Sequence, residues 1–124
     1  MPIQLLIVDD ELDIREFAAK FFQKRKINLL SVSNGEEAIR LVVEQQPQVV
    51  LLDIQMPGID GFEALARIRE LNKHIKVIMI TGRDDVQAKH KAQELGAYGY
   101  IHKPLELDEL EKVVMKLLDK AKEK

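Results

Sequence analysis

Val49-Val50-Leu51-Leu52-Asp53 is the stretch that decides the fold, because four apolar residues in a row end abruptly at a carboxylate. A short, continuous run of Val and Leu is typical of a β-strand that is covered on both faces, as the inner strands of parallel sheets are. Four further short apolar runs have a similar character, at residues 5–8, 29–32, 77–80 and 98–101. The sequence therefore predicts five strands.

Helix-length stretches separate and follow these runs, at residues 11–25, 35–46, 60–71, 84–95 and 106–121. Alternating strands and helices predict an α/β fold with a parallel sheet and helices on both faces, because each crossover returns the chain to the same end of the sheet. The second and fifth runs are diluted by polar or small residues, which is expected of edge strands. We therefore expect a doubly wound, five-stranded parallel sheet in the order 2-1-3-4-5 with five helices.

Composition narrows the possible functions. The 124 residues fit one domain, residues 1–124, and the formal net charge of -2 lacks the basic excess that holds nucleic acid. The chain has no cysteine, which excludes disulfides and thiolate metal sites. No apolar run approaches the roughly 20 residues that cross a bilayer, and the first residues lack the basic region of a signal peptide. We expect a cytoplasmic protein that contacts neither membrane nor nucleic acid directly.

Polar side chains that can take part in binding or catalysis follow four of the predicted strands. They are Asp9 and Asp10 after the first strand, Asp53 after the third, Thr81 after the fourth and Lys103 after the fifth. Because the carboxyl ends of parallel strands share one edge of a sheet, we expect these residues to gather where this topology binds ligands. Each residue alone could be a helix cap, a turn residue or an exposed loop residue. Their coincidence at four strand ends favours a common site.

Carboxylates held together need compensating charge, since two unit charges about 4 Å apart repel by about 4 kcal/mol at an effective dielectric of about 20. Lys103 neutralises one charge, and the remaining oxygen-rich site suits a hard cation such as Mg²⁺, with Mn²⁺ as a substitute. The same site would attract a phosphoryl group, with Thr81 as a hydrogen-bond donor and the carboxylate of Asp53 as the nucleophile. The residues therefore predict Mg²⁺-dependent phosphoryl chemistry.

Two other functions share part of this pattern. A small Mg²⁺-dependent phosphohydrolase with an aspartate nucleophile uses the same carboxylates and cation. A flavin carrier uses the same strand order. No Ser/Thr/Gly-rich phosphate loop follows the first strand, and aromatic residues make up only 5% of the chain, which disfavours the flavin carrier. The phosphohydrolase stays as the alternative.

Four motifs together resemble one family. They are Leu6-Ile7-Val8-Asp9-Asp10-Glu11, Leu51-Leu52-Asp53-Ile54-Gln55-Met56-Pro57-Gly58-Ile59-Asp60-Gly61, Ile80-Thr81-Gly82 and Tyr100-Ile101-His102-Lys103-Pro104. In order and spacing they are similar to the motifs of the CheY-like receiver domains of two-component response regulators, over essentially the whole chain. The resemblance also disfavours the phosphohydrolase, because dehalogenase-like phosphatases carry an Asp-x-Asp motif after the first strand, whereas Asp9 and Asp10 are adjacent.

The resemblance implies a role for each residue of the predicted site. Asp53 would be the phosphoacceptor, taking a phosphoryl group from a phosphohistidine on a sensor histidine kinase or a histidine phosphotransfer protein. Asp10 would bind Mg²⁺ directly and Asp9 through water. Asp53 and the backbone carbonyl of Gln55 would complete the protein ligands, and Lys103 would pair with the phosphoryl oxygens. Self-phosphorylation and self-dephosphorylation would be weak, which makes such a protein a signalling module and not an enzyme.

A switch is implied as well. Thr81 would move toward the phosphoryl group and Tyr100 would change rotamer, so that the fourth helix, fifth strand and fifth helix present a changed surface to a downstream protein target. For Tyr100, a simple half-buried position on an edge strand is the open alternative. Gln55 and Arg83 would flank the path of water to the phosphoryl group. The peptide bond before Pro104 is expected to be cis.

The first predicted helix carries more apolar residues than one packed face needs. Ile14 and Phe17 lie near its active-site end, and with Pro104 and Leu105 they are candidates for docking a phosphotransfer helix pair. The alternative is that all the apolar residues of this helix belong to the core. The three histidines have no metal-ligand spacing and are expected on the surface: His74, His90 and His102.

Overall fold

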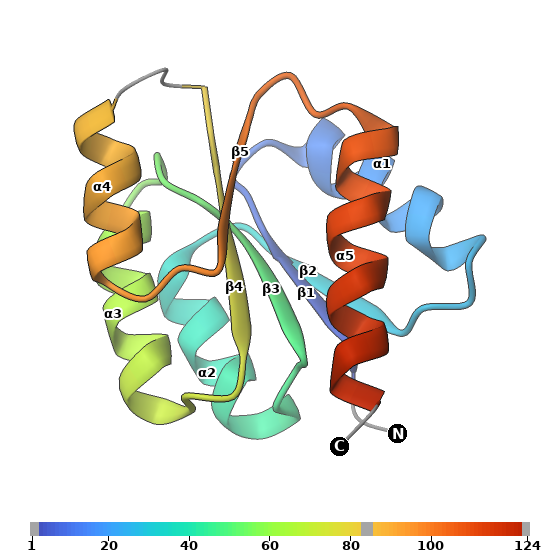
Figure 1. Cartoon of the computed structure of the whole chain (residues 1–124), viewed down its shortest axis with the longest axis horizontal. Helices are drawn as coiled ribbons and strands as arrows, with labels where there is room; N and C mark the ends of the chain where they lie inside the picture. The colour runs from blue at the N-terminus through green and yellow to red at the C-terminus, as the bar shows by residue number, and fades with distance from the viewer. Residues whose placement is uncertain (1–2, 83–85, 123–124) are drawn as a thin grey trace.

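The computed structural model describes residues 3–82 and 86–122. Strands and helices alternate along the chain: β1 (Leu5–Val8), α1 (Leu12–Gln23), β2 (Leu29–Val32), α2 (Gly35–Gln45), β3 (Val49–Asp53), α3 (Gly61–Leu71), β4 (Lys76–Thr81), α4 (Val86–Glu94), β5 (Gly99–His102) and α5 (Leu107–Lys122). All strand pairs are parallel, and the order in the sheet is β2-β1-β3-β4-β5 (Figure 1). The predicted fold class and strand order are confirmed.

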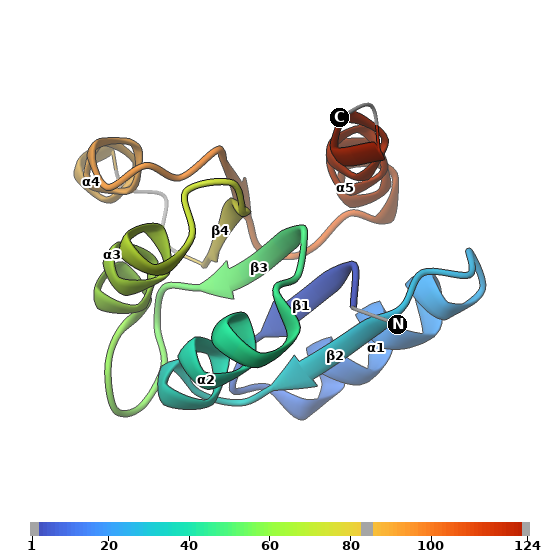
Figure 2. The ribbon, with the colours of Figure 1, turned by 90° about the horizontal axis from the view of Figure 1, so that it is seen from below.

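Helices cover both faces of the sheet, with α1 and α5 on one side and α2, α3 and α4 on the other (Figure 2). The alternation of side chains along each strand divides the core accordingly. Leu5 and Ile7 of β1 pack in one cluster with Phe22 of α1. Leu6 and Val8 point the other way, into the cluster that α2, α3 and α4 cover. The sheet is therefore a central layer that is buried on both faces.

The edge strands are the two that the sequence predicted. Every residue of β1 and β3 is buried, as expected of strands with a neighbour on each side. In β2 and β5, by contrast, most residues are half-buried or exposed, and Leu30 of β2 is 38% exposed. Polar and small residues are tolerated there because those strands have one open side.

Three strands extend beyond their apolar runs. Asp53 is the last residue of β3 and Thr81 the last residue of β4, and β5 ends at His102. The hydrogen-bond ladder explains the difference, because Asp53 pairs with Ile80 and the N–H of Ile54 donates to the carbonyl of Ile80 at 3.0 Å. Residues expected just after the strands are therefore held by the sheet itself.

Local capping residues set the helix boundaries. The side chains of Asn34 and Asp60 accept hydrogen bonds from N–H groups in the first turns of α2 and α3. Gly96, which follows α4, has a φ of +97°, and glycine in such a left-handed conformation commonly ends a helix. The predicted fourth helix began at residue 84, which lies outside the described residues, and α4 is described from Val86. Within the described ranges, no helix is both long and apolar enough to span a membrane.

Candidate functional site

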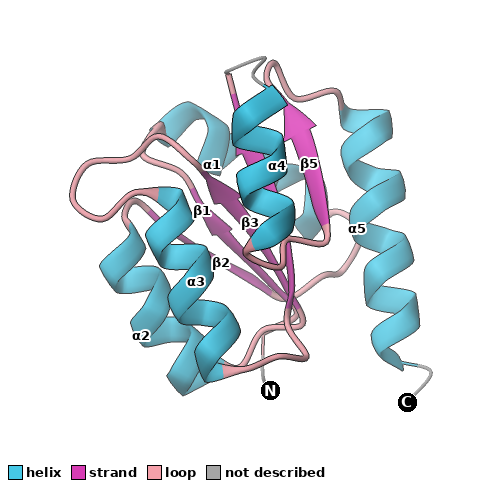
Figure 3. Ribbon diagram, turned by 60° about the vertical axis from the view of Figure 1, so that its left-hand side comes forward, coloured by secondary structure: helices cyan, strands magenta, loops and turns pink. Residues whose placement is uncertain are grey.

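Because all strand pairs are parallel, the strands end on one side of the sheet, where the loops to the following helices gather (Figure 3). The strand ends lie in nearly the same register. Asp53 of β3 pairs with Ile80 of β4, and Thr81 pairs with His102 of β5. The N–H of Lys103 donates to the carbonyl of Thr81 at 2.7 Å. The sheet thereby brings the polar residues of separate strands to a single edge, as predicted.

Four carboxylates meet at this edge: those of Asp9, Asp10, Glu11 and Asp53. One oxygen from each lies within 4.8 Å of the corresponding oxygens of the others. Asp9 and Asp53 are only 1% and 2% exposed, whereas Asp10 and Glu11 are exposed. The N–H of Glu11 donates to Oδ1 of Asp9 at 2.9 Å. In the same way, the N–H of Gln55 donates to Oδ1 of Asp53 at 3.1 Å. Each buried carboxylate is fixed through Oδ1, which leaves Oδ2 for the centre of the cluster.

The ammonium group of Lys103 lies among three of these carboxylates. Its Nζ is 2.9 Å from Oε1 of Glu11, 3.1 Å from Oδ2 of Asp9 and 3.2 Å from Oδ2 of Asp53. The contact with Asp9 is an ion pair without hydrogen-bond geometry, so Oδ2 of Asp9 has no hydrogen-bond partner among the described residues. The peptide bond between Lys103 and Pro104 is cis, as expected.

Burial and charge shift the protonation equilibria of the cluster. Burial, and then the negative charge of Asp9, raises the pKa of Asp53 from 3.8 to about 6, although the N–H of Gln55 and the ammonium of Lys103 act in the opposite direction. Burial lowers the pKa of Lys103, but its contacts with the surrounding carboxylates outweigh burial and leave that pKa above its usual value. A single ammonium therefore does not balance the negative charge of the cluster.

The donor set fits a hard divalent cation. An open hollow of about 470 Å³ beside the cluster is lined by Asp10, Ile54, Gln55, Met56, Pro57, Asp60 and Phe62; we call it the polar hollow. Mg²⁺ typically takes one or two carboxylates with carbonyl oxygens and keeps several waters, which an exposed Asp10 at the edge of an open hollow permits. Oδ2 of Asp9, which has an ion pair with Lys103 but no hydrogen bond among the described residues, is a further buried oxygen that a cation or its water would satisfy.

The two predicted switch residues lie on neighbouring strands. Thr81 is completely buried at the end of β4. Tyr100 lies on the edge strand β5, where it is half-buried and packs against the core cluster under α2, α3 and α4. The half-buried position considered for Tyr100 is therefore found, and its movement stays a prediction. Arg83, expected beside the path of water, lies outside the described residues.

An apolar groove borders the cluster on the side of α1. It has a volume of about 570 Å³, and its lining consists of Glu11, Asp13, Ile14, Phe17, Lys103, Pro104 and Leu105. Phe17 is 49% exposed, whereas Ala18 and Phe22 of the same helix are completely buried. The interpretation that every apolar residue of this helix is core is therefore wrong for Phe17. The three histidines are exposed, as predicted.

Two residues of the site had no role in the sequence prediction. Glu11 reaches Lys103, and Nη1 of Arg15 donates to the backbone carbonyl of Asp9 at 2.7 Å. Only their position in the sequence could have pointed to these residues: Glu11 directly follows the aspartate pair, and Arg15 lies one helical turn further on. Charged residues at the start of an exposed helix are so common that the signal has little specificity.

The loop after Asp53 depends on one glycine. A Cβ atom at Gly61 would lie 2.4 Å from the backbone carbonyl oxygen of Asp53 and 2.6 Å from the Cα atom of Ile54. Only glycine permits this approach, which lets the N–H of Gly61 donate to the carbonyl of Ile54 at 2.9 Å. Asp60, whose side chain accepts a hydrogen bond from the N–H of Glu63, caps α3 directly before this glycine.

Comparison with known proteins agrees with this geometry. Residues 5–115 match the family described as the response regulator receiver domain. Sporulation initiation phosphotransferase F of Bacillus subtilis is 35% identical over 118 residues, which are 95% of this chain and 95% of that protein. Regulatory protein AtoC of Escherichia coli is 36% identical over 115 residues, but this chain spans only 25% of its length.

Solved structures show the same fold. The crystal structure of a CheY-like response regulator receiver domain protein from Methanospirillum hungatei superposes with a TM-score of 0.90 at 27% identity and covers 100% of both chains. No finding supports the phosphohydrolase alternative. The chain belongs to the response regulator receiver domain family, and it is therefore a signalling module of two-component signal transduction.

Proposed function

We propose that Asp53 is the phosphoacceptor and that its donor is a phosphohistidine on a sensor histidine kinase or a histidine phosphotransfer protein. A carboxylate oxygen of Asp53 attacks phosphorus, and the bond from phosphorus to the imidazole nitrogen breaks. The electron pair of that bond stays on the nitrogen, and the ring leaves neutral when its other nitrogen is protonated. One relative is named a phosphotransferase, which supports a phosphorelay role for this chain as well.

The observation that carries the proposal is the buried Asp53 carboxylate facing Lys103. Its Oδ1 is held by the N–H of Gln55, and its Oδ2 lies 3.2 Å from the ammonium. The acceptor is thus oriented before the donor binds. The Lys103 ammonium already lies where the phosphoryl oxygens are expected. Lys103 neutralises part of their charge. Thr81, one residue beyond the β4 partner of Asp53, supplies a hydroxyl.

We assign a Mg²⁺ site to the same pocket, with Asp9, Asp10, Asp53 and the backbone carbonyl of Gln55 as its protein ligands, Asp9 through water. Mn²⁺ would be accepted by the same oxygens. When bound, the cation neutralises charge on the phosphoryl oxygens. Receiver domains generally bind Mg²⁺ at an acidic pocket, and the four clustered carboxylates support the assignment here.

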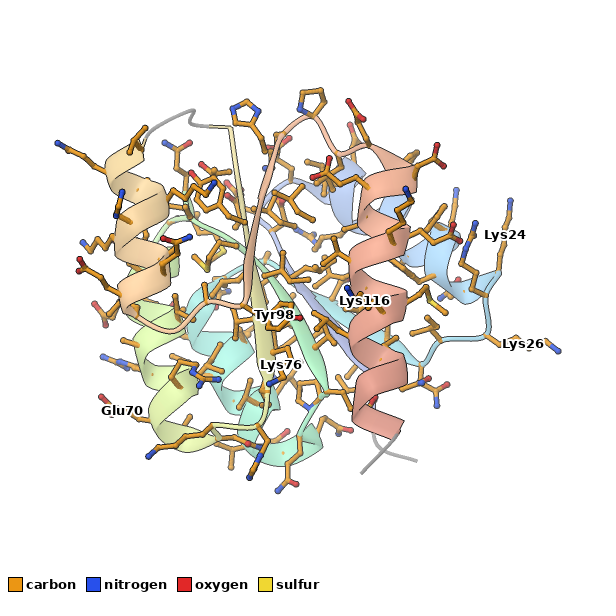
Figure 4. All side chains as sticks on the ribbon, viewed as in Figure 1. Lys24, Lys26, Glu70, Lys76, Tyr98 and Lys116 are labelled. Carbon is orange, nitrogen blue, oxygen red and sulfur yellow. The ribbon has the colours of Figure 1, made fainter. Side chains whose placement is uncertain are left out.

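The output of the switch is the surface formed by α4, β5 and α5. A phosphoryl group on Asp53 draws Thr81 toward it, and Tyr100 on the adjacent strand changes rotamer with it. Directly before β5 lies the exposed Tyr98, and the ammonium of Lys76 is 5.8 Å from the centroid of its ring (Figure 4). A downstream protein target binds this surface differently in the two states, or the phosphoryl group is passed on.

The apolar groove is the docking site for the donor in this proposal. Its apolar part consists of Ile14, Phe17, Pro104 and Leu105, and it shares Lys103 with the carboxylate cluster. A helix pair seated there has its phosphohistidine next to the pocket, which is why we assign the groove to the donor and not to an unrelated partner. The proposal keeps the cytoplasmic location expected from the sequence.

Incubation with acetyl phosphate and Mg²⁺ tests the proposal. Stable phosphorylation of the natural protein that disappears in Asp53→Ala is expected. Rapid multiple turnover of small phosphate esters, without stable labelling, would contradict it and favour a phosphohydrolase.

A further inference from the structure

Glu11 has no part in the proposed transfer, yet it makes the shortest contact of Lys103 with a carboxylate among the described residues. The Nζ–O distance is 2.9 Å for Glu11, against 3.1 Å for Asp9 and 3.2 Å for Asp53. The Glu11 side chain is 57% exposed, whereas those of Asp9 and Asp53 are 1% and 3% exposed. The ammonium is therefore held between two buried carboxylates and one at the surface.

The contacts of Lys103 must change when a phosphoryl group arrives. Lys103 donates hydrogen bonds to Glu11 and Asp53 and faces Asp9 as an ion pair. When the acyl phosphate forms, the negative charge of Asp53 passes to the phosphoryl oxygens, and the ammonium has to follow it. Loss of the Asp9 contact would leave a buried charge without its counterion, which is costly. The Glu11 carboxylate is exposed to solvent, so its contact is the one that breaks.

We propose that Glu11 is a positioning residue that holds Lys103 toward α1 before transfer and thereby slows phosphorylation of Asp53. The inference rests on the proposed function, because it takes Asp53 as the acceptor. Lys103 leaves Glu11 as the transition state forms, so the energy of that contact adds to the barrier. Partly exposed ion pairs are weak, so the expected gain in rate without this contact is about two- to fivefold.

Substitution of Glu11 leaves the local fold intact. Glu11 is the N-cap of α1, but its side chain accepts no capping hydrogen bond, and the bond to Oδ1 of Asp9 is donated by its backbone N–H. Glu16 supplies a matched control, since it carries the same exposed side chain on the same helix. The described ion pairs of Lys103 involve Glu11 and do not involve Glu16.

The test compares Glu11→Gln with Glu16→Gln, each with Lys103 intact and in a Lys103→Ala background. Acetyl phosphate is the donor at saturating Mg²⁺, and intact-mass spectrometry measures the acyl phosphate over time. In this reaction an Asp53 oxygen bonds to phosphorus, the bond from phosphorus to the acetate oxygen breaks, and acetate leaves with the electron pair. We expect a gain of about two- to fivefold for Glu11→Gln, no gain for Glu16→Gln, and no gain for Glu11→Gln once Lys103 is Ala.

A second readout needs neither donor nor cation. The ¹H–¹⁵N signal of the Lys103 ammonium in Mg²⁺-free protein is expected to shift in Glu11→Gln and to stay in place in Glu16→Gln. Equal gains in both variants, or a gain that persists without Lys103, would overturn the proposal. So would slower phosphorylation with weakened Mg²⁺ affinity, which would make Glu11 a metal ligand. If the natural protein is not phosphorylated at all, the proposed function fails, whereas the ammonium signal still reports on the contact.

Discussion

Two hollows flank the carboxylate cluster, and they differ in chemistry. The polar hollow has Asp10, Gln55 and Asp60 in its lining, whereas the apolar groove has Phe17 and Leu105. Lys103 belongs to the lining of the apolar groove and contacts the buried carboxylates. The contrast indicates that the polar hollow binds the cation and that the apolar groove binds the partner protein. Changes on the polar side should affect every donor, and changes on the apolar side only protein donors.

The largest effect is expected at Lys103, which lines the apolar groove and contacts the carboxylate cluster. Lys103→Ala removes the ammonium that neutralises the phosphoryl oxygens, so phosphorylation from acetyl phosphate at saturating Mg²⁺ should fall by about 10²-fold. Lys116→Ala, which removes an exposed lysine of α5, serves as the control and should leave the rate unchanged. A fall of less than about threefold, in a variant whose circular dichroism is unchanged, would show that Lys103 is not needed.

The polar hollow is tested by the cation itself. A ligand at about 100 times its Kd stabilises the folded state by about 2.7 kcal/mol, so Mg²⁺ should raise the free energy of unfolding in urea by that amount. Asp10→Asn should lose most of the increase, because the exposed carboxylate of the proposed ligand set is gone. Glu16→Gln should retain it. An equal response of both variants to Mg²⁺ would place the ion elsewhere.

The pH dependence of stability probes the buried acceptor. The pKa of Asp53 is raised from 3.8 to about 6 in the folded state, so the folded protein binds the proton more tightly than the unfolded chain does. In Mg²⁺-free buffer this group therefore stabilises the fold at low pH, and the contribution is lost as the pH rises from about 4 to 6. Asp53→Asn lacks this loss and should be more stable than the natural protein by about 1–3 kcal/mol at about pH 7. Parallel pH profiles of the two proteins in urea unfolding would contradict this account.

The apolar groove gives the smallest but most selective effect. Phe17→Ala should slow transfer from a phosphorylated histidine phosphotransfer domain by about 5- to 20-fold, the cost of losing an aromatic contact in an interface. Phosphorylation by acetyl phosphate should not change. Leu71→Ala is a matched control, since Leu71 is 50% exposed and Phe17 is 49% exposed. Equal transfer rates in the two variants would remove the groove from the interface.

The fold was predictable because each strand is a short apolar run, and hydrophobic burial in a parallel sheet demands such runs. The strand ends were less predictable, since Asp53 and Thr81 belong to the ladder although their side chains are polar. Backbone hydrogen bonds decide where a strand ends, and the type of side chain at the strand ends does not reveal those bonds. The edge strands were identifiable because β2 and β5 have an open side that tolerates polar residues.

The site was predictable to the extent that it lies at strand ends. Parallel strands bring their carboxyl ends together, so the positions of Asp9, Asp53 and Lys103 followed from sequence. The contact of Glu11 did not follow, because a charged residue at a helix start is ordinary and the reach of a lysine side chain is set by packing. Phe17 was ambiguous for a related reason, since helical periodicity describes an apolar stripe but not which part of it another element covers.

The chemical identity of the phosphorylated residue tests the central claim most directly. Protein treated with acetyl phosphate and Mg²⁺ is reduced with borohydride, which converts an aspartyl phosphate into homoserine, and peptide mass spectrometry then locates the change. We predict homoserine at position 53 and its absence when Mg²⁺ is withheld. Homoserine at position 9 or 10, or phosphate that resists borohydride on another side chain, would contradict the assignment of Asp53 as the acceptor.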